Sequence, residues 1–271
     1  MDLDLVNRRV LVTGSSSGIG AGVAQEFAAE GALVVVHGRN AERANAVAEG
    51  IRAAGGQAAV AVGDLSNNEG AAAVAKAALA AFGGIDILIN NAGGGSEIAE
   101  DVSFFKMTPE DLVYTYQANT VAAFRLIQAL VPEMRERGWG RVINIASAAG
   151  ITPTSAQPDY GPAKAAMINL SLGLSKSLKM TGVTVNCVSP GLTMTDRITS
   201  GMLTTFAQKR GWGDDVQRAK DYFVKGTGQT ASRPAEVADI AYACVMLASP
   251  RADIINGTNF HVDAGISPAI N

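Results

Sequence analysis

The segment Arg9-Val10-Leu11-Val12-Thr13-Gly14-Ser15-Ser16-Ser17-Gly18-Ile19-Gly20 decides the fold of this 271-residue chain. An apolar, β-branched run leads into three spaced glycines, and an apolar-periodic stretch follows them. Glycine lets the turn tighten, lets strand and helix pack closely, and lets a phosphate group approach the backbone. The free N–H groups at the start of the helix would attract that anion. The segment therefore predicts a strand, a phosphate-binding turn and a helix.

The same alternation continues along the whole chain, where short apolar runs are separated by longer Ala-rich helical segments. We predict strands at Arg9–Thr13, Leu33–His37, Ala58–Val62, Ile85–Ile89, Arg141–Ala146, Val183–Val188 and Thr258–Val262. We predict helices at Ile19–Glu30, Ala41–Ala53, Asn68–Phe82, Pro109–Arg137, Asp159–Lys179 and Pro234–Leu247. This order predicts an α/β fold of the Rossmann-like doubly wound type, with a seven-stranded parallel sheet flanked by helices on both faces. Because no linker divides it, residues 1–271 are expected to form a single domain.

Composition excludes several classes of function. The chain is 48% hydrophobic and 17% charged, and its net charge of −3 with no long basic run argues against nucleic-acid binding. The acidic start Met1–Leu5 is unlike a signal peptide, and no apolar run reaches the roughly 20 residues that span a membrane. We therefore expect a cytoplasmic protein with no membrane partner. Cys187 and Cys244 stand far apart without a histidine cluster, which predicts neither a disulfide nor a metal site.

The spacing Thr13-Gly14-x-x-x-Gly18-x-Gly20 resembles the glycine motif of the short-chain dehydrogenase/reductase family. Asp64-Leu65, Asn90–Gly93 and Pro190-Gly191 with Thr195 are similar to segments that contact the nicotinamide cofactor in that family. These segments follow predicted strands, and ligands of open α/β sheets bind at that edge. The resemblance covers the chain from Arg9 to about Ala264. It implies cofactor contacts from Gly14, Ser15, Ser16, Ser17, Gly18, Ile19, Gly20, Asp64, Leu65, Asn91, Ala92, Gly93, Tyr160, Lys164, Pro190, Gly191, Thr193 and Thr195.

The end of the second predicted strand, His37-Gly38-Arg39-Asn40, bears on the choice of cofactor. NAD sites usually place a carboxylate here for the ribose 2′-hydroxyl, whereas NADP sites place an arginine near the 2′-phosphate. Gly38 stands at the expected acid position and Arg39 follows it. We therefore favour NADP(H), with NAD(H) as the alternative.

Tyr160-Gly161-Pro162-Ala163-Lys164 would place a phenol and an ammonium on one helix face. Together with Asn119 and Ser147, these two residues resemble the catalytic tetrad of the family in order and spacing. Hydride transfer to a carbonyl needs a proton donor, and we assign that role to Tyr160. Lys164 would lower the phenol pKa and bind the nicotinamide ribose. Ser147 would hydrogen-bond the substrate oxygen, and Asn119 would hold a water in a proton relay.

The substrate pocket is expected between the loop Ala148–Pro158, the segment Gly94–Met107 and a long stretch, Leu192–Arg233, that resists regular assignment and is predicted to be a lid. These segments carry Phe104, Phe105, Met107, Met202, Phe206, Trp212, Tyr222 and Phe223. Such a lining favours a hydrophobic or aromatic ketone or secondary alcohol as substrate. The same aromatic residues would equally suit the stabilisation of the lid or of a subunit interface.

Two other functions compete with this interpretation. A 3-oxoacyl-thioester reductase would need a basic face for an acyl-carrier protein, to which Arg135, Arg137 and Arg141 could contribute. However, Lys179–Gly182 lacks the arginine often found there in such reductases. A non-catalytic, cofactor-binding regulator is disfavoured because such proteins typically lose the tyrosine or the lysine. The family resemblance also implies a homo-oligomer, a tetramer or dimer, built partly from the Pro109–Arg137 and Asp159–Lys179 helices.

Overall fold

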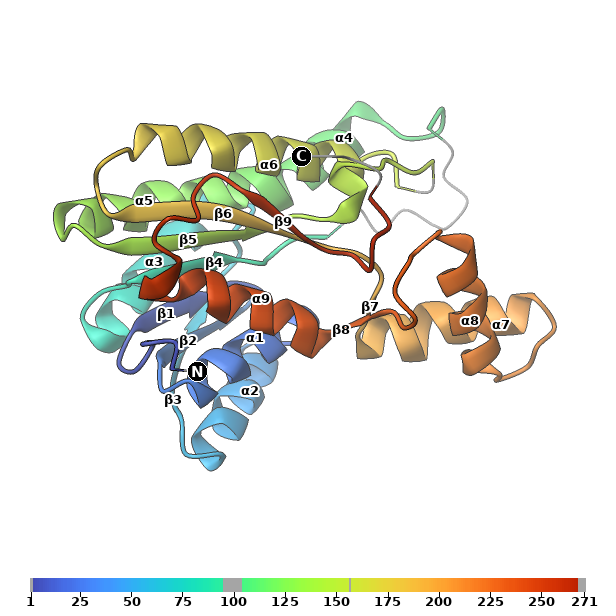
Figure 1. Cartoon of the computed structure of the whole chain (residues 1–271), viewed down its shortest axis with the longest axis horizontal. Helices are drawn as coiled ribbons and strands as arrows, with labels where there is room; N and C mark the ends of the chain where they lie inside the picture. Colours follow the sequence, from blue (N-terminus) through green and yellow to red (C-terminus); the bar gives the residue numbers. More distant parts are fainter. Residues whose placement is uncertain (1, 95–103, 156, 268–271) are drawn as a thin grey trace.

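The computed structural model describes residues 2–94, 104–155 and 157–267. A seven-stranded sheet of order β3-β2-β1-β4-β5-β6-β9 forms its centre (Figure 1), and every neighbouring pair is parallel. The strands are β1 (Arg9–Val12), β2 (Leu33–Gly38), β3 (Gln57–Val62), β4 (Ile87–Asn90), β5 (Gly140–Ile145), β6 (Val183–Pro190) and β9 (Asn259–Val262). The chain winds outward in both directions from β1 and β4. The doubly wound, seven-stranded fold is therefore confirmed.

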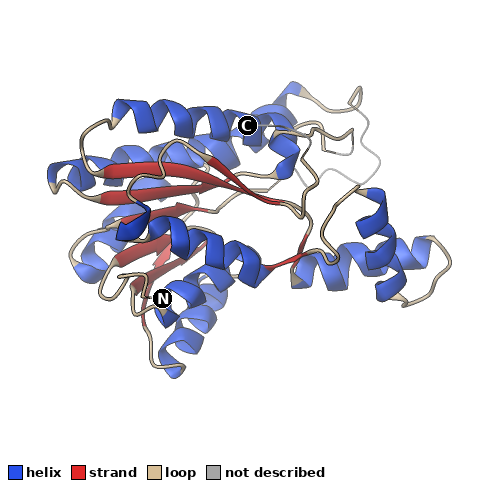
Figure 2. Ribbon diagram, viewed as in Figure 1, coloured by secondary structure: helices blue, strands red, loops and turns tan. Residues whose placement is uncertain are grey.

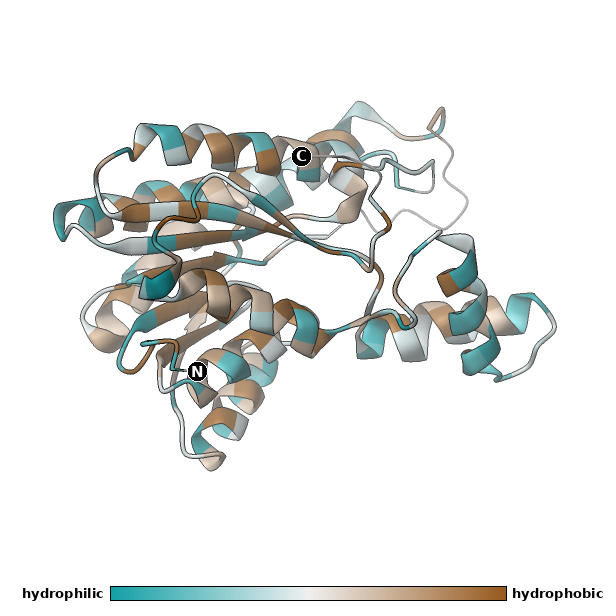
Figure 3. Cartoon of the chain, in the orientation of Figure 1, coloured by the Kyte–Doolittle hydropathy of each residue, from teal (hydrophilic) through white to brown (hydrophobic). Residues whose placement is uncertain are grey.

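Helices cover both faces of the sheet (Figure 2). One face carries α1 (Gly18–Ala29), α2 (Ala41–Ala53) and α9 (Val237–Ala248), and the other carries α3 (Asn68–Phe82), α5 (Ala122–Glu136) and α6 (Tyr160–Ser177). Successive residues of a strand point to opposite faces of the sheet and so belong to different hydrophobic cores. Val10 and Val12 pack with Phe27 of α1, whereas Leu11 between them packs with Leu126 of α5. Because both faces of the central strands are buried, apolar residues dominate them (Figure 3), which explains why they were visible in the sequence.

The predicted helix Pro109–Arg137 is divided in the structure. It consists of α4 (Pro109–Tyr116), a π-helical turn η1 (Gln117–Val121) and α5. Within the turn, the Asn119 Nδ2 donates to the carbonyl of Thr115 at 2.8 Å. In a regular α-helix the backbone N–H of Asn119 would use that carbonyl, so the side chain replaces it. The pattern of apolar residues in the sequence does not reveal that a side-chain hydrogen bond takes the place of a backbone one.

The stretch that resisted assignment contains regular structure. It holds η3 (Arg197–Leu203, a π-helix), α7 (Thr204–Lys209) and α8 (Val216–Gly226), whose buried residues Leu203, Ala207 and Ala219 form a small core. We refer to residues 195–234 as the excursion. Both its ends are joined by a separate parallel pair, β7 (Thr193–Met194) with β8 (Ala235–Glu236). Figure 1 shows α7 and α8 standing beyond the edge of the sheet where β6 ends.

Two features are absent from the part of the chain that the structure describes. No helix in ranges 2–94, 104–155 and 157–267 is long and apolar enough to cross a membrane. Within those same ranges, no group of three or more His, Cys, Asp or Glu side chains is placed to hold a metal ion.

Candidate active site

The glycine turn joins β1 to α1 and is shaped by close contacts. Gly14 and Gly18 adopt left-handed φ angles of 63° and 54°. A Cβ on Gly20 would lie 2.4 Å from the Asn91 side-chain nitrogen and 2.5 Å from the Gly14 carbonyl oxygen. The turn, the first turn of α1 and the end of β4 are therefore packed too closely for any side chain at Gly20.

Hydrogen bonds tie this turn to the neighbouring strand. The Thr13 hydroxyl accepts the backbone N–H groups of Asn91 and Ala92, both at 2.9 Å. The Asn91 Nδ2 donates to the Thr13 carbonyl at 2.9 Å and to the Gly14 carbonyl at 3.2 Å. These bonds connect the ends of β1 and β4, the point from which the sheet winds in both directions.

His37 supports the turn from the other side. Its Nδ1 accepts the Gly14 N–H at 2.9 Å, and its Nε2 lies 3.1 Å from the Gly63 carbonyl. A ring that accepts at Nδ1 and donates at Nε2 is neutral. Burial, which lowers the His37 pKa, favours the same state. His37, which lies within β2, therefore links the turn after β1 to the loop after β3.

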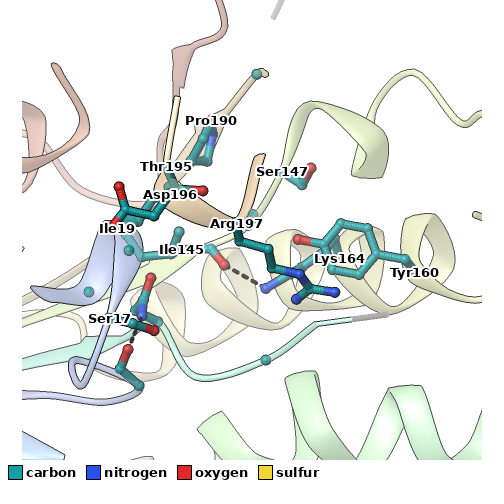
Figure 4. Close-up of a pocket in the computed structure, with 17 residues that line it drawn as sticks. Ser17, Ile19, Ile145, Ser147, Tyr160, Lys164, Pro190, Thr195, Asp196 and Arg197 are labelled. Atoms are coloured by element: carbon teal, nitrogen blue, oxygen red, sulfur yellow. Dashed lines mark hydrogen bonds between the residues drawn. The ribbon is translucent and has the colours of Figure 1, made fainter. Parts of the chain in front are cut away.

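The start of α1 opens into a cavity of about 340 Å³ (Figure 4). Ser17 caps α1 without a side-chain hydrogen bond, so it leaves the first-turn N–H groups available to a ligand. The cavity also reaches the ends of β5 and β6 and the first turns of α6. Its lining residues are Gly14, Ser17, Gly18, Ile19, Gly20, Asn91, Gly93, Ile145, Ala146, Ser147, Tyr160, Lys164, Pro190, Gly191, Thr195, Asp196 and Arg197.

Three members of the predicted tetrad meet in this cavity. Tyr160 begins α6, and Pro162 falls in the first turn, where no N–H donor is required. Lys164 lies one turn later, with its Nζ 5.5 Å from the Tyr160 ring centroid and 2.8 Å from the Ile145 carbonyl, to which it donates. Ser147 follows β5, and its hydroxyl accepts the Ala149 N–H at 3.1 Å.

The electrostatics differ from the expectation for Tyr160. Burial raises the Tyr160 pKa, and the two groups that oppose this are a hydrogen bond with Ser147 and the charge of Arg197. Lys164, which we expected to lower the Tyr160 pKa, does not lower it in this structure. Burial also lowers the Lys164 pKa to about 8. Lys164 is 2% exposed, so desolvation controls both groups.

Asn119, the fourth predicted member, is fully buried and does not line the cavity. Its amide donates to the Gly94 carbonyl at 2.7 Å, and its oxygen accepts the Gly94 N–H at 3.2 Å. A Cβ on Gly93 would lie 2.2 Å from the Asn119 oxygen and 3.5 Å from the Lys164 Nζ. Asn119 thus holds the Gly93-Gly94 backbone beside Lys164.

Several predicted cofactor residues lie outside the cavity lining, namely Ser15, Ser16, Arg39, Asp64, Leu65, Ala92 and Thr193. Ser15 completes the turn, because its hydroxyl donates to the Val12 carbonyl and accepts the His37 N–H. Leu65 is buried against α3. Arg39 is exposed after β2, and its charge contributes to the lowered pKa of Asp64, after the larger effect of the Ser66 N–H bond. The Thr193 hydroxyl donates to the Gly191 carbonyl at 3.2 Å.

The aromatic residues of the excursion pack on one another. The Phe206 ring centroid lies 5.8 Å from that of Trp212, 5.3 Å from Tyr222 and 4.8 Å from Phe223. None of the eight residues proposed for the substrate pocket lines the described cavity. Of the segments expected to bound that pocket, residues 95–103 and 156 lie outside the described residues.

Four lining residues were absent from the sequence prediction: Ile145, Ala146, Asp196 and Arg197. Ile145 and Ala146 immediately precede Ser147, and Asp196 and Arg197 immediately follow Thr195. Adjacency to predicted residues was the only available signal. No residue type or spacing singles out Arg197.

Comparison with known proteins agrees with this architecture. Residues 8–202 match the family model for the short chain dehydrogenase. The chain is 38% identical to an uncharacterized oxidoreductase of Bacillus subtilis (strain 168) over 267 residues, covering 98% of each chain.

Two solved structures are similar over nearly their whole length. One is the L-sorbose reductase of Gluconobacter frateurii complexed with NADPH and L-sorbose, with a TM-score of 0.93, 31% identity and full coverage of both chains. The other is a 7α-hydroxysteroid dehydrogenase complexed with NADH and 7-oxo glycochenodeoxycholic acid, with a TM-score of 0.85, 30% identity and coverage of 100% of this chain and 98% of that one. The chain is therefore an oxidoreductase that belongs to the short-chain dehydrogenase family.

Proposed function

We propose that this protein reduces the carbonyl group of a small molecule, or oxidises the corresponding secondary alcohol, with Tyr160 exchanging the proton. The observation that carries the proposal is the meeting of Ser147, Tyr160 and Lys164 in the cavity that also receives the glycine turn. A phosphate-binding turn and a proton donor in one cavity suit hydride chemistry.

The residues present fit a nicotinamide cofactor. Gly20 leaves no room for a Cβ, and the uncapped start of α1 offers N–H donors that suit a pyrophosphate. We assign its binding to the turn Gly14–Gly20 and, at the nicotinamide end, to Gly93, Lys164 and the segment Pro190–Thr195. When bound, this cofactor supplies or accepts the hydride.

The protein side chains would handle the proton and the developing charge. Because burial raises the Tyr160 pKa, the phenol holds its proton at neutral pH and is suited to donate it to the reacting oxygen. Ser147 would donate a hydrogen bond to that oxygen as negative charge develops there. Lys164 would bind the nicotinamide ribose of the cofactor. We propose Asn119 as a positioning residue that fixes Gly93 and Gly94 beside Lys164.

Replacement of Tyr160 tests the proposal. Tyr160→Phe should reduce kcat by at least about 100-fold, since general acid catalysis contributes roughly that much or more. The Kd for NADPH, measured by cofactor fluorescence, should change little because only the hydroxyl is removed. Tyr242→Phe, on the exposed side of α9, is the matched control and should behave as the wild type. A Tyr160→Phe enzyme that retains tens of per cent of the wild-type rate contradicts the assignment.

We further propose a preference for NADP(H). Arg39 is exposed directly after β2, near Asp64, where its guanidinium can reach a 2′-phosphate. The similar structures carry NADPH in one case and NADH in the other, so similarity alone does not give the cofactor preference. We base the proposal on the residues after β2. No carboxylate occupies position 38, where a Cβ would lie 2.8 Å from the Ser16 Cβ and Oγ.

The substrate class is best approached with a panel that includes a sugar ketone, a steroid ketone and an acyl-carrier-protein thioester. The four excursion aromatics that favoured a hydrophobic substrate, Phe206, Trp212, Tyr222 and Phe223, pack on one another, so they give that preference no support. Two of the three arginines named for the carrier-protein alternative are engaged within the protein. Arg141 is 1% exposed, and Arg137 pairs with Asp86 at 3.4 Å and with Glu133 at 3.3 Å.

A further inference from the structure

Arg197 is a cation in the cavity that the proton chemistry does not use. It is the first residue of η3 and lines the cavity together with Ser147 and Tyr160. In Figure 4 its side chain is drawn on the side of the cavity where Tyr160 and Lys164 lie. Its charge opposes the raised pKa of Tyr160, which is consistent with that position.

The guanidinium has no partner of its own within the described residues. Among residues 2–94, 104–155 and 157–267, no carboxylate forms an ion pair with Arg197 and no carbonyl accepts its hydrogen bond. The other cation of the lining, Lys164, donates to the Ile145 carbonyl. A solvent-facing guanidinium in a cavity is a ready site for an anion.

Helix stability does not explain an arginine at this position. Arg197 begins the helical run that continues through α7, and a cation at the first position of a helix faces the positive end of its dipole. Removal of the arginine would relieve this unfavourable interaction. A role in binding accounts for the residue better.

We propose that Arg197 binds a carboxylate of the substrate, so that this enzyme acts on oxo acids and the corresponding hydroxy acids. The inference rests on the carbonyl chemistry proposed above. A planar guanidinium matches a carboxylate through two parallel hydrogen bonds and fixes its orientation. With the acid held at Arg197, the reacting carbon of the same molecule would face Ser147 and Tyr160.

The pyrophosphate of the cofactor is the other anion that could reach this cavity. The glycine turn and the start of α1 already fit it. Thr195 is the residue of this segment that approaches the turn, since a Cβ on Gly18 would lie 3.6 Å from its methyl carbon. Two residues later, Arg197 acts on Tyr160 instead. The segment thus passes from the phosphate end of the cavity to the reaction centre, which favours the substrate as the partner of Arg197.

The test compares oxo carboxylates of increasing chain length with their methyl esters, each pair differing by one charge. For the best chain length, wild-type kcat/KM should favour the acid by about 10- to 100-fold, the value of one charge-assisted interaction. Arg197→Met should bring this ratio close to one, and Arg197→Lys should keep part of it. Lys225→Met, an exposed lysine on α8 outside the cavity lining, is the control and should keep the wild-type ratio.

Each outcome bears on a definite step. A wild type that reduces acid and ester equally well overturns the assignment of Arg197 but leaves carbonyl reduction standing. A wild type that reduces no member of either series and no other carbonyl contradicts the proposed function itself. If Arg197→Met weakens the Kd for NADPH, measured without substrate, by the same factor as kcat/KM for the acid, the arginine serves the cofactor pyrophosphate and the substrate proposal is wrong.

Discussion

At the scale of single residues, Lys164 is a cation buried in the core beside the proposed proton donor. It is 2% exposed, and burial lowers its pKa from 10.5 to about 8. This difference corresponds to about 3 kcal/mol of unfavourable folding free energy at neutral pH. The ammonium is thus kept in the core at the expense of stability, in contact with the Tyr160 ring.

Lys164→Met should therefore stabilise the cofactor-free protein while it abolishes turnover. After the loss of the Ile145 hydrogen bond is subtracted, the free energy of unfolding at pH 7 should rise by about 1–2 kcal/mol. Each kcal/mol should raise Tm by roughly 2–4 °C. Between pH 8 and 10.5, unfolded Lys164 holds a proton that the folded form has lost, so wild-type stability rises with pH. The difference between variant and wild type should shrink over that range in thermal unfolding. A variant that is less stable at pH 7 contradicts this account.

The cofactor preference also depends on one residue. Arg39→Ala should lower the ratio of kcat/KM for NADPH over NADH by about 10- to 100-fold, as expected for one charge-assisted hydrogen bond. Arg43→Ala, an exposed arginine on α2, provides the control. Introducing an acid at Gly38 is a poor test, because its Cβ would collide with Ser16. If the wild type already prefers NADH, Arg39 does not contact the cofactor phosphate.

At this scale, positions were predictable from the sequence where a motif constrains the backbone, whereas the roles of the site residues stay predictions. Gly14, Gly18, Tyr160 and Lys164 follow from spacing, because strand–turn–helix geometry and helical periodicity are local. The Tyr160 pKa was not predictable in the same way. Its direction depends on burial, which chain segments far apart in sequence create together.

At the scale of elements, the strands were predicted within about two residues because the central ones are buried on both faces and consist mainly of apolar residues. The π-turn at Gln117–Val121 was missed because a single inserted residue hardly alters an apolar period. The helices of the excursion were missed for another reason. They are short, and their apolar side chains serve a small local core centred on Leu203.

We predict that the excursion is a mobile lid that becomes ordered over ligands. Gly211, Gly213 and Gly228 have φ angles of 72°, 61° and 71°, and a Cβ on any of them would meet open space. Hydrogen exchange should be faster in residues 195–234 than in β1 or β5, and it should slow there when NADPH and a substrate analogue are added. Helix α3 is the internal control. Equal protection of the excursion with and without ligands would identify it as a fixed insert.

At the scale of the whole molecule, the family resemblance led us to expect a homo-oligomer. Large apolar side chains remain exposed on the helices named for that role, including Val113 (58%) on α4, Phe124 (42%) on α5 and Leu172 (41%) on α6. Light scattering should give the mass of two or four chains. Phe124→Glu should shift the population towards smaller species, because a buried unpaired carboxylate destabilises an interface. Met180→Glu, at an exposed position after α6, is the control. A wild type with the mass of one chain would contradict the prediction.

The pairing of β7 with β8 has a consequence for how such a protein can diversify. Thr193 pairs with Ala235 and Met194 with Glu236, so the excursion leaves and rejoins the body of the molecule at one place. A segment of different length or composition can be exchanged between these anchors without moving any strand of the main sheet. Doubling the length of such a loop costs only about 0.6 kcal/mol of closure entropy. Substrate preference can therefore drift, or be engineered by grafting, while Ser147, Tyr160 and Lys164, which lie outside the excursion, are kept unchanged.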